Sequence, residues 1–238
     1  MYFFKSLLRR VLPKPLALAI HKRHIVHRML NGPGTDECDI YALPQFISRG
    51  DTVFDIGANN GAYTIAMSKL VGPSGRVYAF EPIPHNLDIL RTVVTRLQFR
   101  NVTILPIAVS DSSCRLPMTV PTVGFGGGYS LARFSRPDDS SDCEVECDTI
   151  DSLIGRGVIA VPTFIKCDVE GAEKQVVAGA AKLIADHHPP WLLETYQSDM
   201  FGIMHALGYR SFVYEVHRTM EPVEQRLTHA RNYYFLTK

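Results

Sequence analysis

Hydrophobic residues in the middle of the chain follow strand-like and helix-like patterns in alternation. Residues 52–57 form a short run of strand-forming residues that ends in glycine, and residues 62–71 then carry apolar side chains at helical spacing. The same two patterns return in residues 76–81 and 84–98. A strand-helix-strand-helix order predicts parallel strands joined by right-handed crossovers, and therefore an α/β fold.

The later part of the chain extends this sheet. Further strands are predicted at residues 163–167, 191–194, 211–216 and 232–236. A single helix is expected after the first of them, with inward-facing apolar residues from Val176 to Ile184. Two other strand-like stretches, 115–120 and 143–148, flank a glycine-rich loop of residues 124–130. We expect this loop to close over the acceptor as a lid, although a wide hairpin turn would have the same composition.

The N-terminal segment is basic and amphipathic. Residues 2–12 and 16–30 combine apolar residues at helical spacing with Lys and Arg, and two prolines separate them, which predicts two short helices. Residues 1–35 contain seven Lys or Arg and no acid. We therefore divide the chain into a helical extension, residues 1–35, and a main domain, residues 36–238.

Two interpretations of this extension remain open. Residues 1–30 could bind an anionic membrane surface, because basic side chains near the lipid and an apolar helix face both favour such contact. Alternatively, the apolar stripes pack on the main domain and the basic residues face water. No run reaches the roughly 20 apolar residues needed to span a bilayer, so we expect a cytoplasmic protein, peripheral at the membrane if the first interpretation holds.

Composition agrees with one globular domain. The chain has 238 residues, of which 46% are hydrophobic and 21% charged, with a net charge of +1. These values exclude a disordered chain, a collagen and a multi-span membrane protein. The five cysteines are an odd number at irregular spacing, which predicts reduced thiols and no zinc site.

The loop after the first strand and the acid that ends the second indicate a nucleoside site. Ligands of parallel sheets bind at the carboxyl ends of the strands, where Asp55 to Gly61 and Glu81 fall. Gly57 and Gly61 do not form a dinucleotide fingerprint, and no Gly-Lys-Ser or Gly-Lys-Thr sequence occurs. Glu81 can accept hydrogen bonds from ribose hydroxyls, while the charge of Asp55 suits an ammonium or sulfonium and repels a pyrophosphate. The pattern favours S-adenosylmethionine.

More acids follow the strand predicted at residues 163–167. Asp168 and Glu170 stand at its carboxyl end, on the same rim as the acids above, where they would face the reactive end of the cofactor. Glu173 is explained by its position at a helix N-terminus, which favours negative charge. Glu194 ends another predicted strand on that rim.

These segments resemble the FkbM family of S-adenosylmethionine-dependent methyltransferases. The matching stretches are VFDIGANNG at 53–61, VYAFEP at 77–82, AVSD at 108–111 and IKCDVEGAE at 165–173, within a resemblance that covers roughly residues 50–196. The resemblance implies a Rossmann-like class I methyltransferase fold. Its sheet would have seven mostly parallel strands, the last one antiparallel, with helices on both faces and with the N-terminal helical extension outside it.

The family also implies an activity and a set of site residues. It implies methyl transfer to a hydroxyl of a sugar, a glycolipid or polysaccharide unit, or a natural product. Four loop residues would hold the methionine part of the donor, one acid the ribose and two residues the adenine: Asp55, Gly57, Asn59 and Gly61, then Glu81, then Ser110 and Asp111. Asp168 and Glu170 would lie next to the transferred methyl.

A hydroxyl is a weak nucleophile at neutral pH, so a general base is expected. Asp168 is the first candidate for this base and Glu194 the second. Asp168 could instead ligate Mg²⁺, but no Asp-Asn pair completes such a site, and we predict no metal. Two rival functions stay open: a non-catalytic protein that binds S-adenosylmethionine, and an N-methyltransferase acting on protein or nucleic acid. The absence of an Asn/Asp-Pro-Pro-Tyr motif speaks against base methylation, and no nucleic-acid partner is expected.

Overall fold

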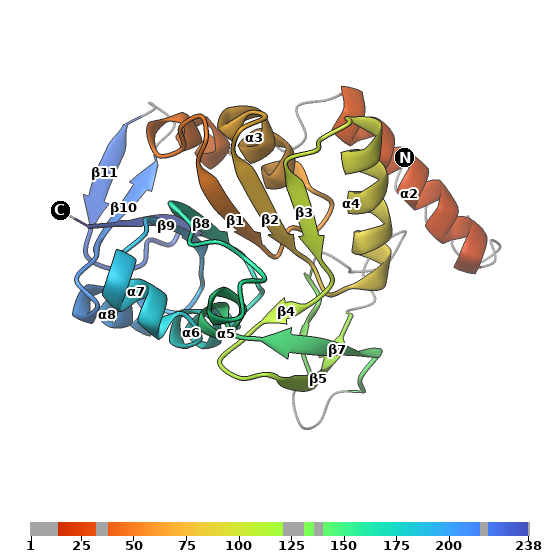
Figure 1. The fold of residues 1–238 in the computed structure, drawn as a ribbon. Coiled ribbons are helices and arrows are strands. Elements are labelled where there is room, and N and C mark those ends of the chain that lie inside the picture. The colour runs from red at the N-terminus through yellow and green to blue at the C-terminus, as the bar shows by residue number, and fades with distance from the viewer. Residues whose placement is uncertain (1–13, 32–37, 121–130, 136–139, 215–218, 238) are drawn as a thin grey trace.

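The main body of the protein is a single large sheet between two layers of helices (Figure 1). The computed structural model describes residues 14–31, 38–120, 131–135, 140–214 and 219–237. The sheet has eight strands in the order β11-β10-β12-β9-β8-β1-β2-β3. Their bounds are β1 Thr52–Ile56, β2 Arg76–Phe80, β3 Val102–Leu105, β8 Phe164–Cys167, β9 Trp191–Glu194, β10 Arg210–Tyr214, β11 Met220–Val223 and β12 Asn232–Leu236.

The sheet confirms the predicted mostly parallel α/β fold and adds one strand to it. Strands β3, β2, β1, β8 and β9 are parallel, and β12 runs antiparallel to both β9 and β10. The eighth strand, β11, pairs antiparallel with β10 at the edge of the sheet. Its sequence contains Pro222, which weakens any strand prediction but is tolerated at an edge, where one side of the strand needs no partner.

Alternate residues of the central strands bury their side chains in the two helical layers. On β1, Val53 packs with Tyr63 and Met67 of α3 (Ala62–Val71), on the face that α4 (Pro84–Arg96) also covers. Phe54, its neighbour, points to the opposite core. That core is shared with residues of α5 (Ile150–Gly155), α6 (Glu173–Ala178), α7 (Ala181–His187) and α8 (Asp199–Ala206).

The helix predicted after β8 is two helices, because Gly179 interrupts it. A Cβ at Gly179 would lie 2.0 Å from the carbonyl oxygen of Ser110, so the chain must pass this point without a side chain. The second helix is then capped from a distance: the Asp151 carboxylate accepts hydrogen bonds from the backbone N–H groups of Lys182 (2.8 Å) and Leu183 (2.9 Å). Nothing local to residues 173–187 reveals this cap.

A small second sheet stands at the carboxyl end of β3 (Figure 1). It consists of β4 (Ala108–Val109), β5 (Cys114–Thr119), β6 (Arg133–Phe134) and β7 (Cys143–Asp148), in the order β4-β7-β5-β6. Its antiparallel β5–β7 pair confirms the two strands predicted at residues 115–120 and 143–148. The loop predicted as a lid, residues 124–130, lies outside the described residues.

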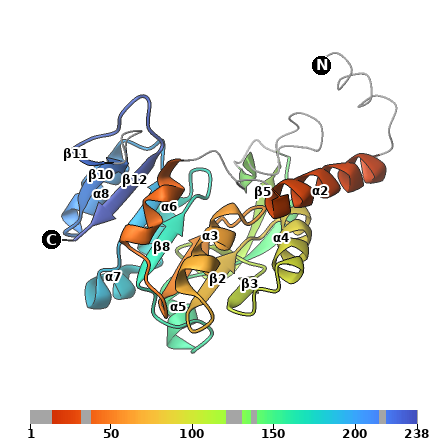
Figure 2. The ribbon, with the colours of Figure 1, turned by 90° about the horizontal axis from the view of Figure 1, so that it is seen from above.

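Helix α2 (Lys14–Asn31) lies along α4, at the opposite end of the large sheet from β10 and β11 (Figure 2). Ile25, Val26 and Met29 are buried in this contact, as the packing interpretation expects. The first predicted helix, residues 2–12, and the proposed domain boundary fall in undescribed parts of the chain. None of the described helices combines the length and the apolar character required to cross a bilayer.

Candidate functional site

A pocket with an empty volume of about 580 Å³ opens at the carboxyl ends of β1, β2 and β8, with the small sheet as its outer wall. Five of the ten predicted site residues line it: Gly57, Asn59, Glu81, Asp168 and Glu170. The other five are absent from its described lining: Asp55, Gly61, Ser110, Asp111 and Glu194.

Glu81 is buried at one end of the pocket and is already held by three donors. Its Oε2 accepts a hydrogen bond from the Asn59 N–H (2.8 Å), and its Oε1 accepts from the Ile83 N–H (2.9 Å) and from Asn86 Nδ2 (3.3 Å). Burial nevertheless raises the pKa of Glu81 to about 7, against the effect of these bonds. A carboxylate accepts about four hydrogen bonds, so Glu81 has room for about one ribose hydroxyl rather than the two expected.

Asn59, which the family resemblance assigns to the methionine part of the donor, has an acceptor that suits a second ribose hydroxyl instead. Its side-chain Oδ1 is buried and has no hydrogen-bond partner among the described residues, although the residue lines the pocket. Such an atom costs free energy until a donor reaches it. Asn59 also adopts a positive φ of 50°, which asparagine tolerates better than most residues. Together with Glu81 it fits the two hydroxyls of a ribose.

Gly57 brings the loop against the strand that carries Asp168. Its φ is 75°, and a Cβ there would lie 1.7 Å from the carbonyl oxygen of Asp168. Only glycine permits this approach. The loop after β1, which begins at Gly57, and the segment after β8, which begins at Asp168, are therefore in direct backbone contact.

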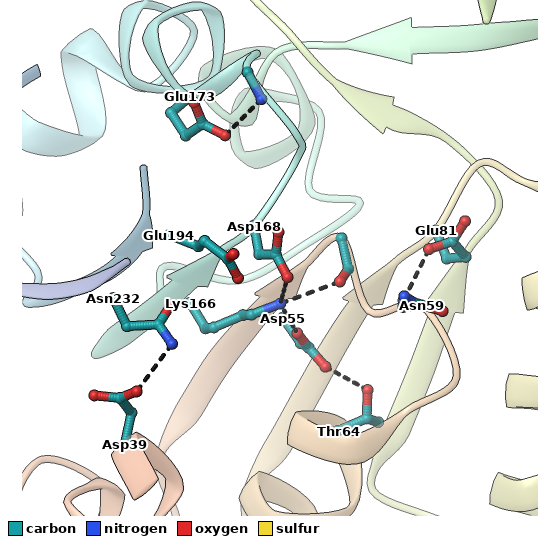
Figure 3. A network of polar contacts seen from close by, with 12 residues as sticks. Asp39, Asp55, Asn59, Thr64, Glu81, Lys166, Asp168, Glu173, Glu194 and Asn232 are labelled. Carbon is teal, nitrogen blue, oxygen red and sulfur yellow. Dashed lines mark hydrogen bonds and ion pairs between the residues drawn. The ribbon is translucent and has the colours of Figure 1, made fainter. Parts of the chain in front are cut away.

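Lys166, which the sequence analysis missed, joins these two segments (Figure 3). This buried side chain donates to the Gly57 carbonyl (Nζ–O 3.1 Å) and to Asp168 Oδ2 (3.4 Å), and its Nζ lies 3.6 Å from Asp55 Oδ1. The ring of Tyr63 covers the ammonium, with its centroid 5.0 Å from Nζ. A lysine inside an otherwise apolar strand was the available signal, because a buried cation requires an acidic partner.

Asp55 lies below the pocket and not in it, which differs from our expectation. The residue is completely buried, its Oδ2 accepts from Thr64 Oγ1 (2.5 Å), and Lys166 faces its other oxygen. It shares a register position with Lys166 on neighbouring parallel strands, so both side chains point to the same face of the sheet. Asp55 thus has Lys166 as a charged partner, and its contact with the methionine part of a donor stays a prediction.

We expect Lys166→Met to destabilise the protein by about 3–5 kcal/mol, because it leaves Asp55 as a buried charge without its cation. Burial raises the pKa of Asp55 and Lys166 opposes this effect. A carboxyl with a raised pKa in the folded state costs stability as it ionises, so the loss should be larger at about pH 8 than at about pH 5. Urea unfolding at both pH values measures it. The double variant Asp55→Asn/Lys166→Met should lose less than Lys166→Met alone, and equal losses would contradict the pairing.

Asp168 and Glu170 line the other end of the pocket. Glu170 has a φ of 52°, an uncommon conformation for this residue type and one that functional sites often hold. Burial, followed by the charges of Asp168 and Glu173, raises the pKa of Glu170 to about 7. Such a group changes its protonation near neutral pH, as an acid-base catalyst must.

Glu194 stands one strand away from these acids. Its preceding residue, Leu193, pairs with Cys167, so Glu194 and Asp168 leave the sheet side by side (Figure 3). Its Oε1 accepts a hydrogen bond from the Tyr196 hydroxyl (3.2 Å). The structure therefore brings Glu194 to the predicted rim but not into the pocket lining.

The three remaining predicted residues, Gly61, Ser110 and Asp111, are absent from the described lining of the pocket. Gly61, with a φ of 94°, is the N-cap residue before α3, and a Cβ there would lie 2.7 Å from Leu90. Ser110 is buried, and its N–H donates a hydrogen bond to the Asp148 carbonyl (2.9 Å). Asp111 is exposed. Their contact with adenine stays a prediction.

Glu173 stands at a helix N-terminus, as predicted, and the cysteines form no disulfide among the described residues. Glu173 accepts from the Gly171 N–H (2.9 Å) at the start of α6. All five cysteines are free thiols, and burial raises the pKa of Cys167 well above its ordinary value. Within the described residues, no group of three or more His, Cys, Asp or Glu side chains is arranged to hold a metal ion.

Comparison with known proteins gives concordant matches. Residues 55–225 match the family model described as the methyltransferase FkbM domain. The chain is 29% identical over 156 residues to 31-O-demethyl-FK506 methyltransferase FkbM of Streptomyces tacrolimicus, which covers 55% of this chain and 59% of that protein. It is 36% identical over 75 residues to a protein-L-isoaspartate O-methyltransferase of Methanococcoides burtonii, covering 32% of this chain and 36% of that one.

A solved structure agrees with these matches. The crystal structure of methyltransferase FkbM from Methylobacillus flagellatus superposes with a TM-score of 0.53 at 20% identity, over 78% of this chain and 43% of that one. At this identity the likeness shows the fold alone. The chain spans from about a third to three fifths of the length of these relatives.

Proposed function

The chain belongs to the FkbM family of methyltransferases, whose cosubstrate is S-adenosylmethionine, and from this premise we propose that it methylates a hydroxyl of a sugar, a glycolipid or polysaccharide unit, or a natural product. One observation carries the proposal. A single pocket is lined by Glu81 and Asn59, whose oxygens can accept hydrogen bonds from a nucleoside, and by two further acids, Asp168 and Glu170.

The residues at the first end bind and orient the donor, which supplies a methyl group on a positively charged sulfur. Glu81 and Asn59 Oδ1 accept hydrogen bonds from the ribose hydroxyls. Ile83 and Val109, which line the adjoining wall, provide apolar surface for the adenine. The missing side chain of Gly57 lets the backbone of Asp168 pack directly against the loop that would hold the donor.

The residues at the second end handle the acceptor. Asp168 accepts the hydroxyl proton as the acceptor oxygen is methylated. Lys166 holds the carboxylate in place through its contact with Oδ2. Alignment of the reacting atoms at about 3–3.5 Å can supply about 7–11 kcal/mol of the barrier, so this fixed geometry is the main contribution of the protein. Glu170, with its pKa of about 7, can pass the proton on to water.

Incubation with methyl-labelled S-adenosylmethionine and a panel of glycans, glycolipids and polyketides tests the function. We expect label in a methyl ether, identified by mass spectrometry. Donor binding without label in any acceptor would favour a non-catalytic binding protein. Label on nitrogen of protein or nucleic acid would favour the rival N-methyltransferase.

Helix α2 supports a second proposal, that the protein contacts an anionic membrane surface. Leu16 and Ile20 are 48% and 45% exposed on a helix that also presents Arg23 and Arg28 to solvent. An apolar strip beside basic side chains is the composition of interfacial helices. The buried half of α2, which packs on α4, leaves this strip available.

We expect Leu16→Ser/Ile20→Ser to weaken binding of the full chain to phosphatidylserine vesicles, measured by sedimentation, by about 100-fold, since burial of each side chain contributes about 1.5 kcal/mol or more. Val158→Ser is the matched control, because Val158 is equally exposed (47%) but lies outside α2. The control should bind as the wild type does. Unchanged binding of the double variant would sink the membrane proposal.

A further inference from the structure

Two arginines flank an exposed tyrosine at the rim that carries Glu194. The guanidinium carbons of Arg226 and Arg231 lie 5.9 Å and 5.7 Å from the ring centroid of Tyr196, and Tyr196 is 49% exposed. We call Tyr196, Arg226 and Arg231 the Arg–Tyr cluster. Tyr196 follows β9 and Arg231 precedes β12, so the cluster stands where these neighbouring strands meet the rim.

The backbone that carries the cluster is well anchored. The hydroxyl of the buried Tyr233 accepts from the Leu227 N–H (2.8 Å) and contacts the Leu227 and Ala230 carbonyls (both 3.1 Å). The Arg231 carbonyl accepts from the Thr195 N–H (2.9 Å). The loop between β11 and β12 is therefore held in place next to β9, and both arginines project from a fixed backbone.

The two guanidinium groups of the cluster lack close acidic partners in the described part of the chain. Within the described residues, neither Arg226 nor Arg231 forms an ion pair with an acid, and the buried Nε of Arg226 has no hydrogen-bond partner. A buried donor without a partner requires an explanation, and a ligand acceptor supplies one. Guanidinium groups bind carboxylates and phosphates through paired N–H donors.

The cluster adjoins the proposed catalytic acids. The Tyr196 hydroxyl donates to Glu194, and the positive charge of Arg231 acts on Glu170. Three carboxylates alone would repel an anionic acceptor. Two guanidinium groups at the same rim offset that repulsion and hold the anion to one side of the acids.

We propose that the Arg–Tyr cluster is an acceptor subsite for an oxyanion, a carboxylate or a phosphate, carried by the hydroxyl-bearing substrate. The proposal rests on the proposed methyl transfer and narrows its substrate class to anionic acceptors. Bound in this way, the anion would place a neighbouring hydroxyl beside Asp168.

Calorimetric titration of the full chain, saturated with S-adenosylhomocysteine, tests the subsite with glucuronate, glucose 6-phosphate and neutral glucose as probes. We expect an anionic probe to bind about tenfold or more tightly than glucose, and Arg226→Gln or Arg231→Gln to weaken it about tenfold. Comparing the affinities for glucuronate and glucose 6-phosphate shows whether the subsite prefers a carboxylate or a phosphate. Arg210→Gln is the matched control: Arg210 also lies over an aromatic ring (Phe212, 5.6 Å) but begins β10 opposite Leu236, at the other end of β12 from Arg231.

The outcomes separate the two proposals. Three results would overturn the subsite: glucose binds as tightly as the anionic probes, Arg226→Gln and Arg231→Gln both keep the wild-type affinity, or neither anion binds. The affinity for S-adenosylhomocysteine, measured first in each variant, reports on folding and on the donor pocket. If the wild type fails to bind S-adenosylhomocysteine, the methyltransferase proposal itself fails; if it binds and only the anions do not, the subsite alone fails.

Discussion

Asp168→Asn should lower the rate of methyl transfer by about 10²- to 10⁴-fold and leave the affinity for S-adenosylhomocysteine nearly unchanged. The amide has the shape of the carboxyl group but cannot accept the proton of the acceptor hydroxyl. Its oxygen can still receive the hydrogen bond from Lys166, which the wild-type Oδ2 accepts at 3.4 Å. The pocket geometry should therefore survive while the chemistry is lost.

Single-turnover rates and calorimetry on the same preparations measure this effect. Asp199→Asn is the matched control, because Asp199 is an exposed acid paired with Lys174 at the start of α8. Glu194→Gln tests the second candidate for the base, and Glu170→Gln tests the acid proposed to pass the proton on to water. If either of them loses more activity than Asp168→Asn, the base is assigned to the wrong carboxylate.

Glu81→Gln should weaken the binding of S-adenosylmethionine by about 10- to 150-fold, the range for a lost hydrogen bond to a charged group. The pKa of Glu81 is about 7 before the donor binds. Ribose hydroxyls donate to the ionised form and therefore lower this pKa on binding. Donor affinity should consequently rise from about pH 5 to about pH 7 and then level off, and the Gln variant should lack this dependence.

The stability of the donor-free protein gives an independent readout. Because the folded-state pKa of Glu81 is raised, its contribution to stability is fully present below the ordinary value for glutamate and is lost as the pH rises through about 7. Glu81→Gln should therefore melt no lower than the wild type at about pH 8, although it binds the donor less well. Glu146→Gln, on an exposed acid paired with Arg115, is the control. A large drop in melting temperature with unchanged donor affinity would make Glu81 a structural residue only.

Local signals were sufficient to find the pocket acids. Glu81 and Asp168 each end an apolar strand run, and parallel strands place their carboxyl ends on one rim, so their meeting follows from the α/β order. The tight turn at Gly57 also follows from the sequence, because a strand that turns at once into a helix needs a residue free to adopt a positive φ. Each of these inferences uses only neighbours in the sequence and one rule of sheet geometry.

Other features depend on which distant segments meet. The contact between Asp55 and Lys166 is one of them, because residues 55 and 166 share a register position that only the strand order creates. The cap that Asp151 provides for α7 and the pairing of Tyr196 with two arginines likewise join residues far apart in the chain.

The amino-acid sequence by itself determined the alternation of strands and helices, the acids at the strand ends and the close turn at Gly57, because these depend on local periodicity and backbone sterics. The tertiary structure alone decided which charges are neutralised internally and which remain for a ligand. The physical reason is that burial and partner distance set the energy of a charge, and both depend on the packing of the whole sheet.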